Sequence, residues 1–107
     1  MTTKRMFRES SEVSQGEGEA VKYYFDTLPW GGTPTSISVV VFDVTDPDTW
    51  VNVTNTVMPT NSPTVAGHVV TLSHLRALTD AHIYRIEVAF TSNGNEFEAY
   101  GIIVAGE

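Results

Sequence analysis

The sequence contains no cysteine among its 107 residues. This absence excludes disulfide bonds and metal sites built on thiolates. A chain of this length forms one domain and removes roughly two-thirds of its unfolded surface from water. The hydrophobic fraction of 41% is ordinary for a globular protein. We therefore expect a single domain whose core forms without covalent crosslinks.

Basic residues are also scarce, with six Lys and Arg against 13 Asp and Glu, for a formal net charge of −7. Binding to phosphate backbones needs clustered cations, so nucleic acid is not an expected partner. Lys4, Arg5 and Arg8 lie together near the N-terminus, with Phe7 between them. This cluster has two interpretations, a solvated tail or an arm that contacts a negatively charged partner.

Long apolar runs are missing. The longest, ISVVVF at residues 37–42, contains a serine and falls far short of a membrane span. The opening MTTKRMFRESS has basic residues, but the apolar run of a signal peptide does not follow them. We expect a protein that is made in a cytoplasm, stays reduced and binds no membrane.

Motifs of catalysis are equally absent, including the G-x-S-x-G nucleophile elbow and the H-E-x-x-H zinc motif. Asp43, Asp46 and Asp48 crowd one short segment and offer oxygen ligands that suit calcium. The segment lacks the glycine and terminal glutamate of an EF-hand loop, and aspartates also cap turns. We predict no enzymatic activity and no cofactor, and favour turn capping over calcium binding.

The patterns that are present are those of β-strands, since no dozen residues show clean helical spacing. In 82–92, Tyr84, Ile86, Val88 and Phe90 alternate with polar residues, which predicts a half-buried strand. Asn93-Gly94 then suits a type I′ turn into 95–106, so 82–106 is expected to form a hairpin. The remaining predicted strands cover 19–27, 37–45, 50–58 and 67–75, with a weak first strand near 3–8.

About seven short strands favour an all-β, antiparallel β-sandwich, with a closed barrel as the alternative. We assign 19–107 to the sandwich. Residues 1–18 are expected to be an N-terminal arm, or a first strand and a polar linker. The strand at 37–45 is apolar on both faces, which predicts either a central strand or a strand covered by another subunit.

One segment, LRALTDAHIYRIEV at residues 75–88, resembles the start of strand F in fibronectin type III and immunoglobulin-like sandwiches. The resemblance implies a tyrosine corner, in which the Tyr84 hydroxyl bonds to backbone a few residues upstream. Leu75 and Leu78 would then close the core beside it. The alternative is that Tyr84 is a core residue whose hydroxyl reaches water.

Three longer segments widen the resemblance, namely MFRESSEVSQGEGEAVKYYFDT, TPTSISVVVFDV and LTDAHIYRIEVAFTSNGNEFEAYGIIV. Together they resemble small immunoglobulin-like structural proteins of tailed bacteriophages. This implies a non-enzymatic virion protein, such as a head decoration (cement) protein or a neck component, that binds capsid, neck or tail proteins. Its own copies are a further candidate partner. The alternative is a fibronectin type III-like module that binds carbohydrate or protein within a larger surface protein.

Four aromatic residues outside the expected core are candidate contact anchors, because aromatic side chains are enriched at interfaces. They are Tyr24, Trp30, Trp50 and Tyr100. Trp30 lies in the loop LPWGG, where it is either an exposed anchor or a lid over the core. In the carbohydrate-binding alternative, Trp30 and Trp50 would stack on sugars.

Overall fold

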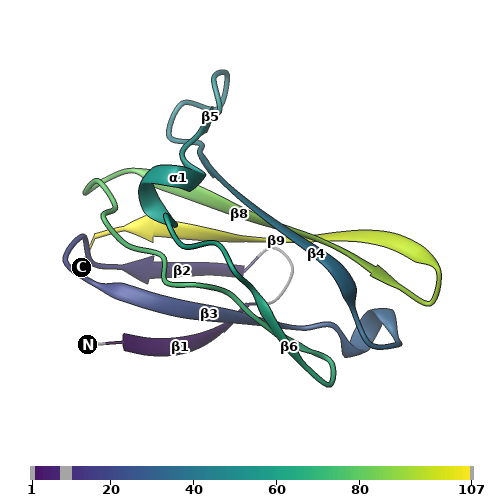
Figure 1. The fold of residues 1–107 in the computed structure, drawn as a ribbon. Helices are drawn as coiled ribbons and strands as arrows, with labels where there is room; N and C mark the ends of the chain where they lie inside the picture. Colours follow the sequence, from purple (N-terminus) through teal and green to yellow (C-terminus); the bar gives the residue numbers. More distant parts are fainter. Residues whose placement is uncertain (1, 8–10, 107) are drawn as a thin grey trace.

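The protein is an all-β fold of two sheets (Figure 1). A computed structural model describes the backbone of residues 2–7 and 11–106, and the side chains of residues 13–106. The four-stranded sheet has the order β1 (Thr2–Phe7), β3 (Ala20–Asp26), β7 (Val69–Thr71), β6 (Thr64–Ala66). The five-stranded sheet has the order β2 (Ser11–Gln15), β9 (Asn95–Ala105), β8 (Ile83–Ser92), β4 (Thr35–Asp43), β5 (Val51–Asn52). The strands of the protein therefore lie in two separate sheets and not in one closed barrel.

Helical structure is confined to the 3₁₀ turn η1 (Leu28–Trp30) and the four-residue α1 (Thr54–Val57) among the described residues. Neither segment approaches the length and hydrophobicity that a membrane-spanning helix needs.

The core lies between the two sheets and follows from the period-2 alternation of the strands. From the four-stranded sheet, Tyr23 and Phe25 are fully buried. From the five-stranded sheet, β8 buries every second residue, including Ile86 and Val88, and β9 adds Ile103. The predicted inward face of 82–92 is confirmed.

The hairpin of β8 and β9 is also confirmed. The two strands pair antiparallel from Ile83↔Val104 to Ser92↔Asn95. Asn93 and Gly94 have φ angles of 52° and 77°, as a type I′ turn requires at both central positions. This hairpin forms the middle of the five-stranded sheet, with β4 next to β8.

The prediction of a strand over 50–58 is wrong for most of its length. Only Val51–Asn52 forms a strand, and α1 follows at once. Val53 and Val57 fit both patterns, because residues four apart share a face in a helix as well as in a strand. The helix is favoured because the Thr54 hydroxyl accepts a hydrogen bond from the Val41 N–H at 2.9 Å, which fixes the turn against β4.

The segment predicted as one strand over 67–75 is shorter and belongs to a hairpin. Gly67 has a φ of 60° at the turn between β6 and β7, and β6 was not predicted. Val70 and Leu72 are buried as expected. After β7 ends at Thr71, the Leu72 N–H still bonds the Tyr23 carbonyl at 2.8 Å, and Leu75 forms an isolated bridge with Val21.

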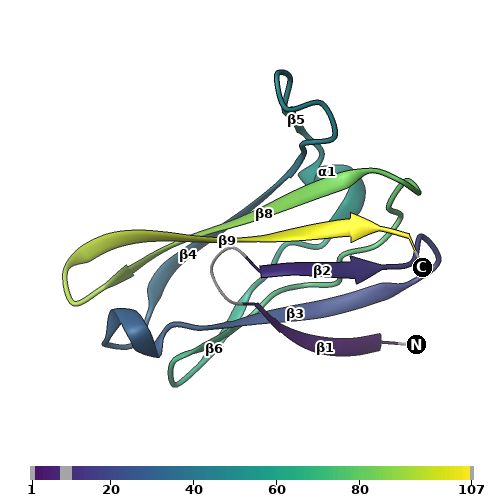
Figure 2. The ribbon, with the colours of Figure 1, turned by 180° about the vertical axis from the view of Figure 1, so that it is seen from behind.

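The N-terminal region differs most from expectation. Residues 11–15, predicted as part of a polar linker, form β2 beside β9. β1 pairs with β3, and both of these pairs are parallel, so the sandwich is not purely antiparallel. Figure 2 shows β1 and β2 on the same side of the molecule, each at the edge of its own sheet. The two strands that precede β3 thus complete both sheets.

Candidate functional site

The outer face of the five-stranded sheet gathers large side chains that the core does not use. Two rows of paired residues cross the sheet side by side. One row is Phe42↔Arg85↔Ile102, and the other is Val40↔Glu87↔Tyr100. These residues alternate with core residues along β4, β8 and β9, and all of them are half-buried. Alternation alone therefore places them on one outward surface.

Arg85 lies at the centre of this face, between two aromatic rings. Its guanidinium carbon Cζ lies 3.7 Å from the ring centroid of Tyr100 and 5.3 Å from that of Trp50. The Trp50 ring in turn lies 5.9 Å from the Phe42 ring. We call Phe42, Trp50, Arg85, Glu87 and Tyr100 the aromatic–arginine cluster. Attraction between the cation and the ring quadrupoles holds these side chains together.

Glu87 neutralises the charge of this arginine. The Arg85 Nε donates to the Glu87 Oε2 at 2.8 Å, and the two side chains are 21% and 20% exposed. They are two residues apart on β8, so both point outward from the sheet. The cluster therefore presents aromatic surface around an internally paired charge, a composition typical of protein interfaces.

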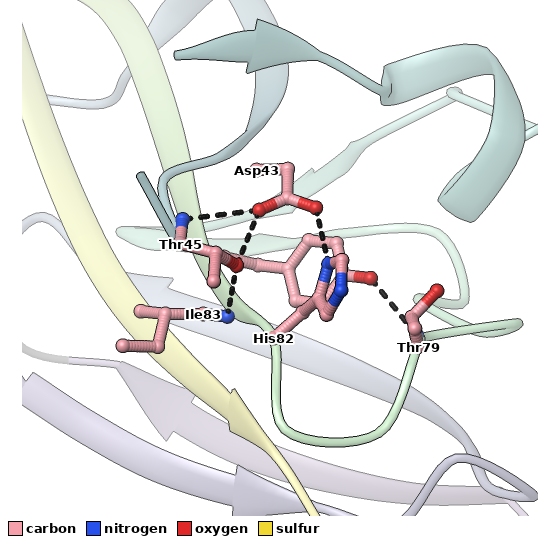
Figure 3. A network of polar contacts seen from close by, with 6 residues as sticks. Asp43, Thr45, Thr79, His82 and Ile83 are labelled. Atoms are coloured by element: carbon pink, nitrogen blue, oxygen red, sulfur yellow. Dashed lines mark hydrogen bonds and ion pairs between the residues drawn. The ribbon is translucent and has the colours of Figure 1, made fainter. Parts of the chain in front are cut away.

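A second group of polar residues ties two loops together at one end of the same sheet (Figure 3). The carboxylate of Asp43, the last residue of β4, lies 2.7 Å from the Nδ1 of His82. Its other oxygen accepts bonds from the backbone N–H of Thr45 at 3.0 Å and from the Thr45 hydroxyl at 2.6 Å. The Thr45 hydroxyl also accepts from the Ile83 N–H at 2.9 Å. These bonds join the start of the β4–β5 connection to the start of β8.

The Asp43 carboxylate is stabilised in its charged form. Burial alone would raise the pKa of Asp43, but hydrogen bonds from Thr45 and His82 outweigh it and lower the pKa below its ordinary value. Thr45 lies in a bend just after β4, and His82 lies directly before β8. The arrangement therefore serves to fix two loops.

Tyr84 completes this end of the sheet. Its side chain is buried, and its hydroxyl accepts a hydrogen bond from the Thr79 N–H at 2.9 Å, five residues upstream. The His82 ring stacks against the Tyr84 ring at 6.4 Å. Leu75 and Leu78 are buried in the same core cluster. This is the geometry that the tyrosine-corner hypothesis requires, and its contribution to stability stays a prediction.

The aspartates proposed as calcium ligands act as turn-capping residues. The Asp46 carboxylate accepts from the Asp48 N–H at 3.0 Å, and Asp43 is engaged as described above. Within residues 13–106, His, Asp and Glu side chains form no group of three that would hold a metal ion. The structure thus provides a structural role for Asp43 and Asp46.

The predicted contact residues fall in different places. Trp50 and Tyr100 come together on the aromatic–arginine cluster. Tyr24 is half-buried on β3 of the other sheet. Trp30 is half-buried and packs edge-on against Phe90, with ring centroids 5.5 Å apart, so it covers one end of the core. Of the N-terminal cluster, Lys4, Arg5 and Phe7 belong to β1, and Arg8 lies outside the described residues.

Arg85, Glu87 and Phe42 were not among the predicted contact residues. The signal for Arg85 and Glu87 was present, because both alternate with the inward residues of the clearest strand. What the sequence lacked was the register of β8 with β9 and the path of the connection after β4, which bring Tyr100 and Trp50 close to Arg85.

A shallow hollow of about 430 Å³ lies at the opposite end of this sheet, near the β8–β9 turn and the start of β4. Its lining includes Ser36, Ala89 and the carboxylates of Glu96 and Glu98. The hollow is open to solvent, so it lacks the enclosure of a typical small-molecule site.

Comparison of the chain with protein-family models, with curated proteins and with solved structures yields no match.

Proposed function

We propose that this protein is a non-enzymatic structural component of a tailed-bacteriophage virion, a head decoration (cement) or head–neck protein with an immunoglobulin-like fold that binds other virion proteins. The observation that carries the binding role is the aromatic–arginine cluster on the outer face of a rigid sheet. The virion assignment rests on the resemblance of residues 6–27, 33–44 and 78–104 to structural proteins of tailed bacteriophages. Aromatic and arginine side chains are the residue types that most often dominate binding energy at protein interfaces.

The strand order supports the immunoglobulin-like part of the proposal. If β3, β7 and β6 are taken as strands B, E and D, and β9, β8, β4 and β5 as G, F, C and C′, both sheets follow the order of an immunoglobulin-like sandwich. The bond from the Thr79 N–H to the Tyr84 hydroxyl fits the corner of strand F. The parallel pairing of β1 with β3 departs from that plan and makes β1 an addition to it.

The rigidity of the surface supports binding as its role. Phe42, Arg85 and Tyr100 belong to three adjacent strands, so their backbones are held by the sheet. A preorganised surface loses less conformational entropy when it binds, and therefore keeps more of its contact energy as affinity. Such a surface suits a component that is assembled once and stays bound.

The experiment that tests the proposal is mass spectrometry of purified particles from cultures that express this reading frame, together with co-sedimentation of the purified chain with shell proteins. We expect the chain in the particles and in the shell pellet. Its absence from both would show that the protein is not a virion component.

The second candidate, a fibronectin type III-like module that binds carbohydrate, is favoured by one observation. Trp50 is 47% exposed and lies beside the Arg85–Glu87 pair, and such a combination can stack on a sugar ring and bond its hydroxyls. The half-buried Trp30 packs on Phe90 at the other end of β8, so the two tryptophans do not form one platform. Quenching of tryptophan fluorescence by oligosaccharides, lost in Trp50→Ala and kept in Trp30→Phe, would favour this function.

A further inference from the structure

The connection between β4 and α1, residues 44–53, stands out from the rest of the sandwich. Figures 1 and 2 show the β5 region projecting away from the rest of the fold, above α1 and β8 in both views. Residues 45–52 are all exposed, and Trp50 and Val51 are 47% and 51% exposed. Ile83, which follows the corner at the base of the connection, is 36% exposed. Large apolar side chains on a projecting loop are accessible to a partner without any rearrangement.

We propose that this projecting loop, together with the aromatic–arginine cluster at its base, is the docking surface for a partner protein. The partner contributes an apolar segment flanked by lysine or arginine, and Trp50 is the central contact. The inference rests on the proposed function, because it names the surface and the partner chemistry of the same binding role.

The loop is ordered by its own hydrogen bonds. The Thr49 N–H bonds the Asp46 carbonyl at 3.1 Å, and the Asp48 N–H bonds the Asp46 carboxylate at 3.0 Å. At its base, the Val44 N–H donates to the Ile83 carbonyl at 2.8 Å. The loop therefore needs little ordering when it binds, which separates it from an exposed flexible connection.

The indole of Trp50 is also held in place. One side of it faces Phe42 and the Arg85 guanidinium, yet nearly half of its surface is exposed. Arg85 is itself positioned by Glu87 and Tyr100. A large aromatic side chain that is fixed on one side and open on the other is the type of residue that becomes a central contact when a partner covers it.

The negative charge of the loop indicates which side chains the partner carries. The loop carries Asp46 and Asp48, both exposed, and neither belongs to an ion pair among the described side chains. The nearest arginine of the cluster, Arg85, is already neutralised by Glu87. The whole chain has a net charge of −7, so a second copy would bring like charge to this surface. A segment with lysine or arginine beside its apolar residues is complementary to it.

The experiment uses the full chain and a random linear peptide library displayed on messenger RNA, with counter-selection on the Trp50→Ser variant. We expect enriched peptides that combine apolar residues with lysine or arginine. Their affinity should fall roughly tenfold or more in Trp50→Ser, and should weaken in Asp46→Asn/Asp48→Asn and at high salt. Asparagine keeps the Oδ1 acceptor of the Asp46 turn, so this double variant changes charge and leaves the loop conformation intact.

Two control variants separate a local effect from a general one. Leu28→Ser removes an apolar side chain that is 59% exposed, but on η1, which belongs to a different connection. Glu17→Gln/Glu96→Gln removes two charges away from the loop. Both controls should keep full affinity, and thermal melting should be unchanged in all four variants. The inference is overturned if no peptides enrich, if enriched peptides bind Trp50→Ser as tightly as the original chain, or if they are acidic.

Co-sedimentation with shell proteins separates this inference from the proposed function. If the original chain co-sediments and Trp50→Ser does not, the result supports both the virion function and the docking surface. If both chains co-sediment equally, the protein is a virion component that binds through another surface, and the inference is wrong. If neither chain co-sediments and the protein is also absent from purified particles, while the peptides still depend on Trp50, the docking surface stands and the virion function fails.

Discussion

At the residue scale, individual polar atoms at the strand ends decide how the loops are held. The Tyr84 hydroxyl accepts from the Thr79 N–H, and the Asp43 carboxylate accepts from His82 and Thr45. A buried polar group that loses its only partner costs more than the bond itself contributes, because it cannot regain water. Single-atom substitutions therefore test these assignments directly.

Replacing Tyr84 by Phe should lower the free energy of unfolding by about 1 kcal/mol, because it removes the acceptor of the Thr79 N–H. Urea unfolding measures this change. Tyr24→Phe is the matched control, since Tyr24 is half-buried on the outer side of β3, and it should change stability far less. Equal effects of the two substitutions would contradict the role of the Tyr84 hydroxyl.

Replacing Asp43 by Asn should lower stability in a pH-dependent way. Because the pKa of Asp43 is lowered in the folded protein, the charged carboxylate stabilises the fold above the ordinary value of 3.8. That stability is lost as the pH falls through the lower, folded-state pKa. The difference between the original chain and Asp43→Asn should thus be present at neutral pH and shrink in acid.

Urea unfolding across this pH range gives the measurement, with the exposed Asp48→Asn as control. A difference that stays constant into strong acid would show that the carboxylate charge is not what stabilises this end of the sheet.

At the element scale, β2 shows how a short polar segment becomes a strand. Gln15 at its end is 1% exposed. Its amide nitrogen donates to the carbonyls of Leu75 at 2.8 Å and Glu19 at 3.1 Å, and its amide oxygen accepts from the Tyr23 hydroxyl at 2.6 Å. Tyr23 belongs to the opposite sheet, so the Gln15 side chain joins β2 and its own sheet to the four-stranded sheet. This contact explains why residues 11–15 are a strand and not a linker.

We expect Gln15→Ala to lower the free energy of unfolding by about 2 kcal/mol, from the lost hydrogen bonds of a buried network and the space left behind. The amides of β2 should also exchange faster with deuterium than those of β8. The effect should be smaller when Tyr23 is already Phe, because the two side chains share a bond. Additive effects of the two substitutions would contradict the network.

At the scale of the whole molecule, net charge and exposed apolar surface have opposite effects on self-association. The outer face of β4 carries Val40 and Phe42, which favours contact between copies, whereas a net charge of −7 opposes it. We expect the free chain to sediment as a monomer at low salt and to associate increasingly as salt screens the repulsion. Sedimentation velocity at two salt concentrations measures this. A dimer that weakens with salt would indicate attraction between charged groups instead.

The sequence predicted best where neighbouring local signals agree. The 82–106 hairpin was predicted correctly because the alternation of β8 and the Asn93-Gly94 turn agree. The 50–58 segment was mispredicted because its valines fit two periods, and the contact of Thr54 with β4, which selects the helix, joins residues 13 apart. The candidate site was predicted in part, since Trp50 and Tyr100 were named but not Arg85 between them.

By itself, the sequence determined that the protein is an all-β domain without cysteine, carries a strong negative charge and has a hairpin at its C-terminal end. These properties depend on composition and on neighbours within a few residues. Only the tertiary structure decided that β2 joins β9, that Gln15 connects the two sheets, and that Arg85 lies between Trp50 and Tyr100. Each of these depends on strand register or on side-chain contacts, which are set by the packing of residues far apart in the chain.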